Sequence, residues 1–243
     1  EFGRVLFRST GRLLAQPEFR YPNLARTRGG LIKALSLSVA DLTSLAADIA
    51  GQLDLVLAPH DMLAFDVAAG LEPRFLYVEP ACIGHLQLLQ AVKDSGRPAF
   101  AAIRDYTEPE LERLVQTIDG DRLTLLNVVE PQEVDNDVFT GVAEMRWLAR
   151  FGLPVGHRDT FVDETVTLVA AAAGAKVVEK RLTLDRSSEV PQHARSLLPG
   201  ELARLTTRLR ALSPTPSTPQ RARRLARPSS DLPARPPLVP ASA

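Results

Sequence analysis

The sequence predicts an α/β fold of the TIM, or (β/α)8, barrel type, apparently incomplete, with about six of the eight strand–helix units present. Short apolar runs alternate with segments whose apolar residues recur at helical spacing. The runs are apolar almost throughout, which is typical of parallel strands with both faces buried. No G-x-G-x-x-G follows an early strand, so the doubly wound dinucleotide-binding sheet, which shares this alternation, is disfavoured. The strands missing from a complete barrel would be the N-terminal pair.

Six strands are expected from these apolar runs, at Leu53–Pro59, Phe75–Pro80, Pro98–Ile103, Leu123–Val129, Leu153–His157 and Lys176–Leu182. Ser38 can cap the first helix, and the "TEPE" that starts at Thr107 has the spacing of a capping box. The expected helices are Ser38–Gly51, Met62–Ala69, Gly84–Lys93, one opening at Thr107, Val138–Phe151, Val162–Ala173 and Pro199–Leu212.

Composition divides the chain into three segments. Residues 1–9 contain "RVLFRS", which one frame of a widely used sequencing adapter encodes, so we interpret them as a cloning or sequencing scar; a natural, frayed N-terminus is the alternative. A scar would mean that the natural gene begins upstream and that the chain is a fragment. Residues 10–212 form the predicted barrel. Residues 213–243 are rich in Pro, Ser and Arg, and we expect a disordered tail there.

Charge and cysteine content exclude several classes of protein. The 29 basic and 29 acidic side chains cancel, which argues against a general nucleic-acid or membrane-surface binder, although the tail is basic. Cys82 is the single cysteine, so no internal disulfide can form, and the chain suits a reducing compartment. We therefore expect a cytoplasmic protein with no specific nucleic-acid partner and no membrane partner.

Three blocks near the C-terminus carry a family resemblance. They read "LPVGHRDT" (Leu153 to Thr160), "AAGAKVVEKRLTLDR" and "PQHARSLLPGEL". They resemble "lPvGySDHt", "AlGAkviEKHfTLdr" and "pDHkaSLeP-eL" of the sialic acid (N-acetylneuraminate) synthase family, with the spacing between blocks preserved. The resemblance extends over about Leu31 to Leu212 and includes "APHD" (Ala58 to Asp61) in place of the family's "TPFD".

The resemblance implies a reaction, substrates and a cofactor. The family condenses phosphoenolpyruvate with an N-acetylhexosamine such as N-acetylmannosamine, and a divalent metal, typically manganese, activates the sugar aldehyde. Such chemistry needs a Lewis acid on the carbonyl and positive charge or hydrogen-bond donors on the phosphate. Phosphoenolpyruvate and an N-acetylhexosamine are thus the implied small-molecule partners, and a homodimer is compatible with the family.

Most of the residues that the family uses for this chemistry are replaced. The two metal histidines fall on Thr160 and Arg181, and the aspartate of "pDH" falls on Gln192. A guanidinium stays protonated, so Arg181 would repel a cation. Four further family positions, the Lys and Ser of "KIaS", the Ser of "ilStG" and the His of "lHC", fall on Tyr77, Pro80, Ala102 and Asn127.

Five family positions keep their residues. Asp159, Glu179 and Lys180 are retained at catalytic positions, and His193 and Ser196 at substrate-binding positions. Each also has a plainer interpretation: we favour an ion pair between Glu179 and Lys180 over contact with a sugar hydroxyl, and a lone surface histidine such as His193 is more often idle. Outside these positions, we expect Cys82 to be a small buried residue and Trp147 to belong to the core.

The sequence therefore favours a degenerate, non-catalytic member of the family that binds a sugar or a protein partner in nonulosonic acid biosynthesis. No cofactor is expected in that case. The alternative is an active phosphoenolpyruvate-dependent synthase with a rebuilt manganese site, for which Asp61, His157 and Asp159 are the candidate ligands. A gene fragment without a function of its own is a third interpretation, because missing strands expose a sheet edge.

Overall fold

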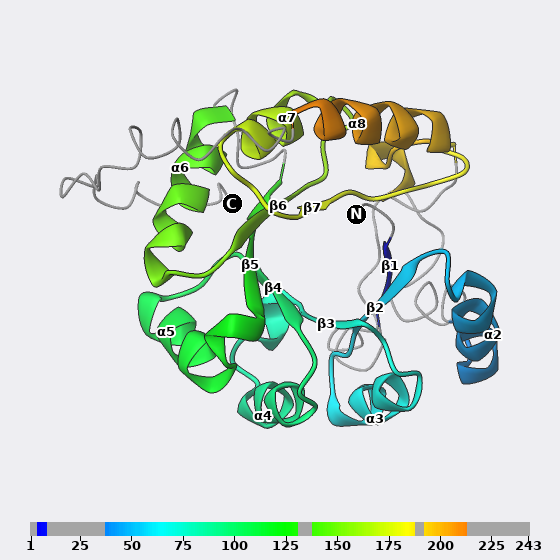
Figure 1. Ribbon diagram of the computed structural model, residues 1–243, viewed down its shortest axis with the longest axis vertical. Coiled ribbons are helices and arrows are strands. Elements are labelled where there is room, and N and C mark those ends of the chain that lie inside the picture. The colour runs from blue at the N-terminus through cyan, green and yellow to red at the C-terminus, as the bar shows by residue number, and fades with distance from the viewer. Residues whose placement is uncertain (1–3, 9–36, 131–137, 188–191, 213–243) are drawn as a thin grey trace, which may run out of the picture. The chain divides into compact units, whose positions relative to one another are not determined.

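The structure is a computed structural model that describes residues 4–8, 37–130, 138–187 and 192–212 (Figure 1). The chain forms two compact units, which we describe separately. The first unit comprises Glu1–Leu126 with Phe151–Pro154, and the second comprises Asn127–Arg150 with Val155–Ala243. Strand β5 (Leu123–Val129) begins in the first unit and ends in the second.

The first unit contains a parallel sheet whose strands follow the order of the chain. β1 (Arg4–Arg8) pairs with β2 (Asp54–Ala58), β2 with β3 (Phe75–Val78), and β3 with β4 (Ala99–Ile103). Every residue of β4 is buried, as expected for a strand covered on both faces. The uninterrupted apolar runs of the sequence therefore form the core of this unit.

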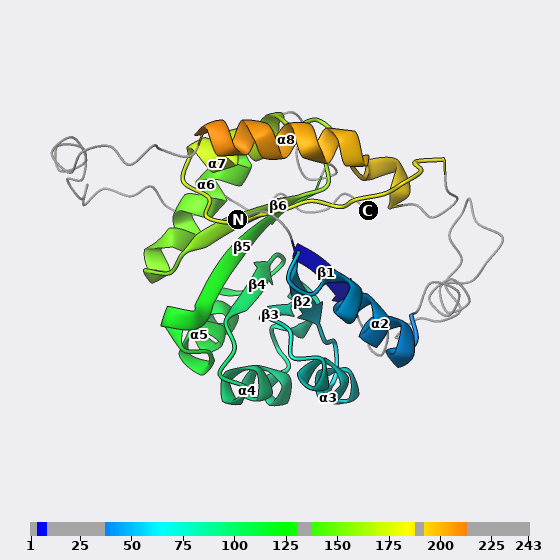
Figure 2. The ribbon, with the colours of Figure 1, turned by 45° about the vertical axis from the view of Figure 1, so that its right-hand side comes forward.

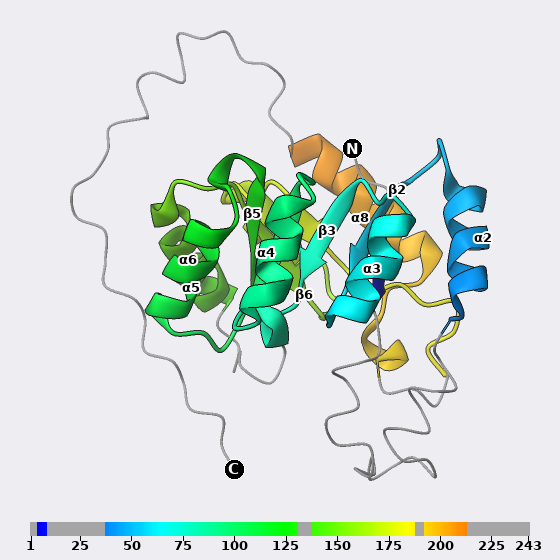
Figure 3. The same ribbon diagram turned by 90° about the horizontal axis from the view of Figure 1, so that it is seen from below.

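In the part of this unit that the structure describes, four α-helices follow these strands. They are α2 (Val39–Ile49), α3 (Met62–Gly70), α4 (Leu86–Asp94) and α5 (Glu108–Thr117), with 3-10 turns at Pro80–Cys82 and Gly120–Arg122. The capping signals act as predicted: the Asp41 backbone N–H donates to Ser38 Oγ over 3.1 Å, and the Thr107 backbone N–H donates to Glu110 over 2.8 Å. Figures 2 and 3 show α3 and α4 lying side by side along one face of the strands of this unit.

The second unit continues the same alternation of strand and helix. After β5 come α6 (Val138–Leu148), β6 (Val155–Asp159), α7 (Thr165–Ala172), β7 (Val178–Glu179) and α8 (Pro199–Leu212), with 3-10 turns at Ala149–Phe151 and His193–Arg195. β6 and β7 are parallel, with Arg158 opposite Glu179. Gly174 ends α7 with a φ of 110°, a conformation that side chains rarely adopt.

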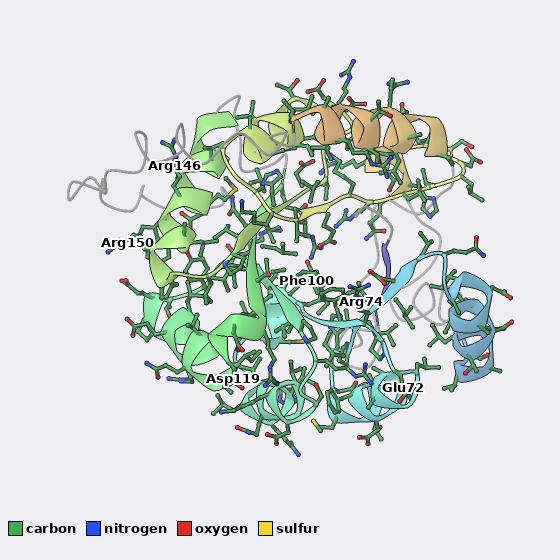
Figure 4. The ribbon with its side chains drawn as sticks, viewed as in Figure 1. Glu72, Arg74, Phe100, Asp119, Arg146 and Arg150 are labelled. Atoms are coloured by element: carbon green, nitrogen blue, oxygen red, sulfur yellow. The ribbon has the colours of Figure 1, made fainter. Side chains whose placement is uncertain are left out.

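Helices α7 and α8 cover one side of the second unit (Figure 1). Leu197, Leu205 and Leu209 pack there against apolar side chains of α7, β7 and α8. Trp147 is a core residue, as predicted, and is only 6% exposed. The Arg150 guanidinium lies 5.8 Å from the Trp147 ring centre, and Arg146 and Arg150 both point outward (Figure 4).

The predicted α/β fold of an incomplete barrel is confirmed, and all six predicted strands are present. β7 is shorter than its apolar run suggested, and α7 begins three residues later than Val162 because Asp163 Oδ1 accepts from the backbone N–H of Thr165. β1 falls within residues 1–9, the segment that the sequence analysis left out of the fold. The predicted tail at 213–243 lies outside the described residues.

Cys82, the single cysteine of the chain, is fully buried, as expected. Among the helices that the structure describes, none combines the length and apolar character needed to cross a membrane.

Candidate functional site

The second unit places charged side chains on both faces of the strand ends of β6 and β7. His157 and Asp159 lie on the face that meets α7, because Asp159 Oδ2 accepts a 2.6 Å hydrogen bond from Thr167 Oγ1 of that helix. His157 Nε2 is 3.0 Å from the same carboxylate oxygen. All three side chains are buried. This side of β6 therefore joins the strand to its covering helix.

Lys180 completes this helix-facing network, which we define as His157, Asp159, Thr167 and Lys180. Its Nζ donates to Asp159 Oδ1, to the Phe161 carbonyl at 2.7 Å and to Thr167 Oγ1 at 3.2 Å. These three acceptors match the three donors of an ammonium group. The network is thus a hydrogen-bonded support between β6, β7 and α7.

Asp159 is ionised in this network. Burial acts to raise the pKa of Asp159, but the hydrogen bond from His157 and the positive charge of Lys180 outweigh burial and hold the pKa below its ordinary value. A buried carboxylate next to a buried ammonium is stable only while both partners remain. We therefore regard Asp159 and Lys180 as residues that hold the strand ends in place.

The opposite face carries two arginine–glutamate pairs. Successive side chains of a strand point to opposite faces, so Arg158 points away from His157 and Asp159. Arg158 Nε lies 3.4 Å from Glu179 Oε1 of β7, and Arg181 Nη2 lies 3.7 Å from Glu130 Oε1, directly after β5. We define the strand-end cluster as Glu130, Arg158, Thr160, Glu179 and Arg181. Thr160 follows β6 directly, and among the described residues its buried Oγ1 has no hydrogen-bond partner.

The predicted ion pair between Glu179 and Lys180 is wrong. The two residues are consecutive at the end of β7, so their side chains leave it on opposite faces. Glu179 pairs with Arg158, whereas Lys180 pairs with Asp159. Of the three retained catalytic positions, only Glu179 lies in the strand-end cluster.

The retained substrate-binding positions lie in the loop that precedes α8. His193 Nδ1 is 2.6 Å from Thr183 Oγ1, so this histidine makes a contact within the loop. Ser196 is 3% exposed, and its hydroxyl donates to the Gln192 carbonyl over 2.7 Å. These contacts order the loop itself, and a role of His193 or Ser196 toward a ligand stays a proposal.

The remaining substituted positions serve the fold. Asn127 Nδ2 donates to the Gly141 carbonyl over 2.6 Å and so ties β5 to α6. In the first unit, Tyr77 and Ala102 are buried in β3 and β4, and Pro80 begins a 3-10 turn. Asp61, a candidate metal ligand, instead caps α3, because its Oδ1 accepts from the Ala64 N–H over 2.8 Å.

The strand-end cluster does not suit a divalent cation. Within the described residues, no group of three or more His, Cys, Asp or Glu side chains is placed to hold one. At roughly 4 Å, a guanidinium repels a dication by about 8 kcal/mol in a surface-like environment. The two arginines already balance the two glutamates, so the cluster also lacks the excess negative charge that would favour a metal.

Two members of the cluster, Arg158 and Glu130, were not predicted from the sequence. Arg158 stands in "GHRDT" where the family block "GySDHt" has a serine, so its substitution was visible in the aligned motif. Glu130 follows an ordinary apolar strand, and no local pattern marks it as the partner of a residue 51 positions further along.

Comparison with known proteins agrees with the resemblance. The chain matches the NeuB family over residues 15–218. It is 27% identical over 195 residues to an N,N'-diacetyllegionaminic acid synthase of Legionella pneumophila, covering 76% of this chain and 54% of that protein. It is 38% identical over 58 residues to the N-acetylneuraminate-9-phosphate synthase of Homo sapiens, covering 24% of this chain and 16% of that protein. The chain spans about half the length of the curated relatives that match most of it.

Solved structures of low identity share the fold. The N-acetylneuraminic acid synthetase of Leptospira borgpetersenii matches with a TM-score of 0.75 at 18% identity, over 91% of this chain and 78% of the other. A spore coat polysaccharide biosynthesis protein of Bacillus subtilis matches with a TM-score of 0.71 at 18% identity, over 94% and 63% of the two chains.

Proposed function

The chain belongs to the NeuB family, and we propose that it is a degenerate member that binds a sugar at the strand-end cluster without catalysing condensation. It is a sialic or nonulosonic acid synthase-like protein, and its proposed place is in the biosynthesis of such sugars, in the cytoplasm. One observation carries the proposal: Arg181 stands where the resemblance puts a metal histidine, and it is paired with Glu130.

The composition of the cluster supports a sugar as ligand. Guanidinium groups only donate hydrogen bonds, and carboxylates only accept them. A sugar hydroxyl does both, so it can satisfy an arginine and a glutamate of one pair together. Phosphoenolpyruvate offers acceptor oxygens that can satisfy the arginines, but its ionised groups have no donor for the two glutamates of the cluster.

The alternative is an active phosphoenolpyruvate-dependent synthase, which membership of the family favours. It would need Asp61, His157 or Asp159 as metal ligands. Asp61 caps α3, and His157 and Asp159 hydrogen-bond to each other beneath α7. Recruiting any of them to a metal would break contacts that stabilise the fold.

A combined assay of product formation and binding tests the proposal. The chain is incubated with N-acetylmannosamine, phosphoenolpyruvate and manganese, and phosphate release is followed while calorimetry measures binding of the sugar alone. We expect sugar binding without phosphate release above the protein-free rate. Phosphate release that matches the consumption of phosphoenolpyruvate would establish the active synthase instead, and absence of sugar binding would remove the proposed ligand.

A further inference from the structure

We infer that Arg181 takes the place of the divalent metal in this chain, as a resident positive charge that makes the strand-end cluster metal-free. The inference deepens the proposed function and rests on it for the identity of the ligand. It rests on the disagreement between the residues present and a metal site.

Arg181 is the most accessible of the three cations at the ends of β6 and β7. Its side chain is 26% exposed, whereas those of Arg158 and Lys180 are 6% and 4% exposed. A dissolved ion or sugar can therefore reach the Arg181 guanidinium, whereas Arg158 and Lys180 are buried against Glu179 and Asp159. Any incoming cation meets this guanidinium first.

The main chain holds Arg181 in a fixed position. The Arg181 carbonyl accepts a 2.8 Å hydrogen bond from the Leu197 N–H, and the Thr183 N–H donates to the Leu197 carbonyl over 2.9 Å. These bonds form a parallel bridge between Leu182 and Leu197, next to α8. The guanidinium thus projects from a segment anchored on both sides, as a preorganised binding group requires.

Glu130 pairs with the guanidinium and balances its charge. The 3.7 Å between Arg181 Nη2 and Glu130 Oε1 exceeds a direct hydrogen bond, so an oxygen of a ligand or a water can bridge these two atoms. A hydroxyl oxygen would accept from the arginine and donate to the glutamate. The pair can therefore bind a sugar oxygen by hydrogen bonds. Because no metal ion takes part, a chelator should not weaken this binding.

Manganese binding, measured by electron paramagnetic resonance, tests the inference directly. We expect no binding to the wild-type chain at millimolar manganese. The Thr160→His/Arg181→His variant should gain a manganese site, because two imidazoles join Glu130 once the guanidinium is gone. Arg146→His is the matched control, since Arg146 is exposed on α6 (Figure 4), and it should gain nothing.

Thr160 is buried, so the double variant is first checked for a cooperative melt. If it does not fold, Arg181→His alone replaces it, because position 181 is partly exposed, and a weaker manganese site beside Glu130 is the expected result. Manganese bound by the wild type would overturn the inference. A folded histidine variant without manganese would overturn it too, because the guanidinium would then not be what excludes the metal.

Sugar binding separates this inference from the proposed function. Calorimetry with N-acetylmannosamine should give the same Kd, within about twofold, whether a chelator or manganese is present. Arg181→Gln should raise this Kd at least tenfold, which is about the loss of one charged hydrogen bond. Sugar binding that occurs only when manganese is present would contradict the inference. If the wild type binds no sugar, the proposed function fails, while the manganese titration still decides whether Arg181 excludes the metal.

Discussion

Asp159 shows that a retained residue need not retain a role toward a ligand. Its carboxylate accepts from His157, Thr167, Lys180 and the backbone N–H of Phe161. All of these partners lie on the side of β6 that meets α7. The neighbouring Arg158 and Glu179 face the other way; Arg158 replaces the serine of the family motif, whereas Glu179 is retained. Identity to the motif therefore does not tell which face of a strand a residue occupies: Asp159 and Lys180 lie on the side that meets α7, and Glu179 lies on the other.

Replacement of Asp159 should therefore affect stability. Asp159→Asn leaves the buried ammonium of Lys180 without its counter-charge, so we expect a loss of about 3–5 kcal/mol in the free energy of unfolding, measured by urea denaturation. Asp163→Asn is the matched control: Asp163 is exposed and its Oδ1 accepts from the Thr165 backbone N–H at the start of α7, which an asparagine oxygen can also do, so the change should stay below about 1 kcal/mol. Equal losses in the two variants would contradict the account.

The same variant tests the expected pH dependence. The folded pKa of Asp159 lies below its ordinary value of 3.8, so its contribution to stability is complete above that value and is lost as the pH falls below it. The wild type should lose stability on acidification through this range more steeply than Asp159→Asn. Parallel pH profiles of the two proteins would show that this carboxylate is not the group responsible.

At the scale of elements, α7 is held to the sheet by a hydrogen bond as well as by apolar packing. Thr167→Val keeps the shape of the side chain and removes the hydroxyl that donates to Asp159. We expect a loss of about 1–3 kcal/mol in unfolding free energy, because the acceptor stays buried. Thr207→Val on α8 is the control, since its exposed hydroxyl bonds only to a carbonyl of its own helix. A loss in the control as large as in Thr167→Val would contradict this account.

The elements were largely predictable from the sequence, and the pairing of their charges was not. Apolar runs and helical spacing identified the strands and helices, Ser38 and Thr107 marked two helix starts, and α8 has the predicted bounds of Pro199–Leu212. The predicted pairing of Glu179 with Lys180 was wrong although their positions were predictable, because consecutive residues of a strand point to opposite faces. The partners Glu130 and Arg158 are set by neighbouring strands, which local sequence does not encode.

At the scale of the whole molecule, the fold of the family is present, and Thr160 and Arg181 stand at the positions where the resemblance puts the metal histidines. The chain matches the family over residues 15–218 and spans about half the length of its main curated relatives. In the second unit, Arg158, Thr160 and Arg181 stand where the family motif has a serine and two histidines, and each arginine pairs with a glutamate. The central claim is that this site has exchanged a metal for arginine and no longer takes phosphoenolpyruvate.

The most direct test of that claim is a thermal melt of the whole chain, alone and with manganese plus phosphoenolpyruvate at millimolar levels. A ligand that binds only the folded state stabilises it, by about 2.7 kcal/mol at 100 times its Kd, and so raises the melting midpoint. The account predicts a cooperative melt whose midpoint is the same with and without these ligands. A clear rise of the midpoint would show that the site still binds metal and phosphoenolpyruvate, and would contradict it.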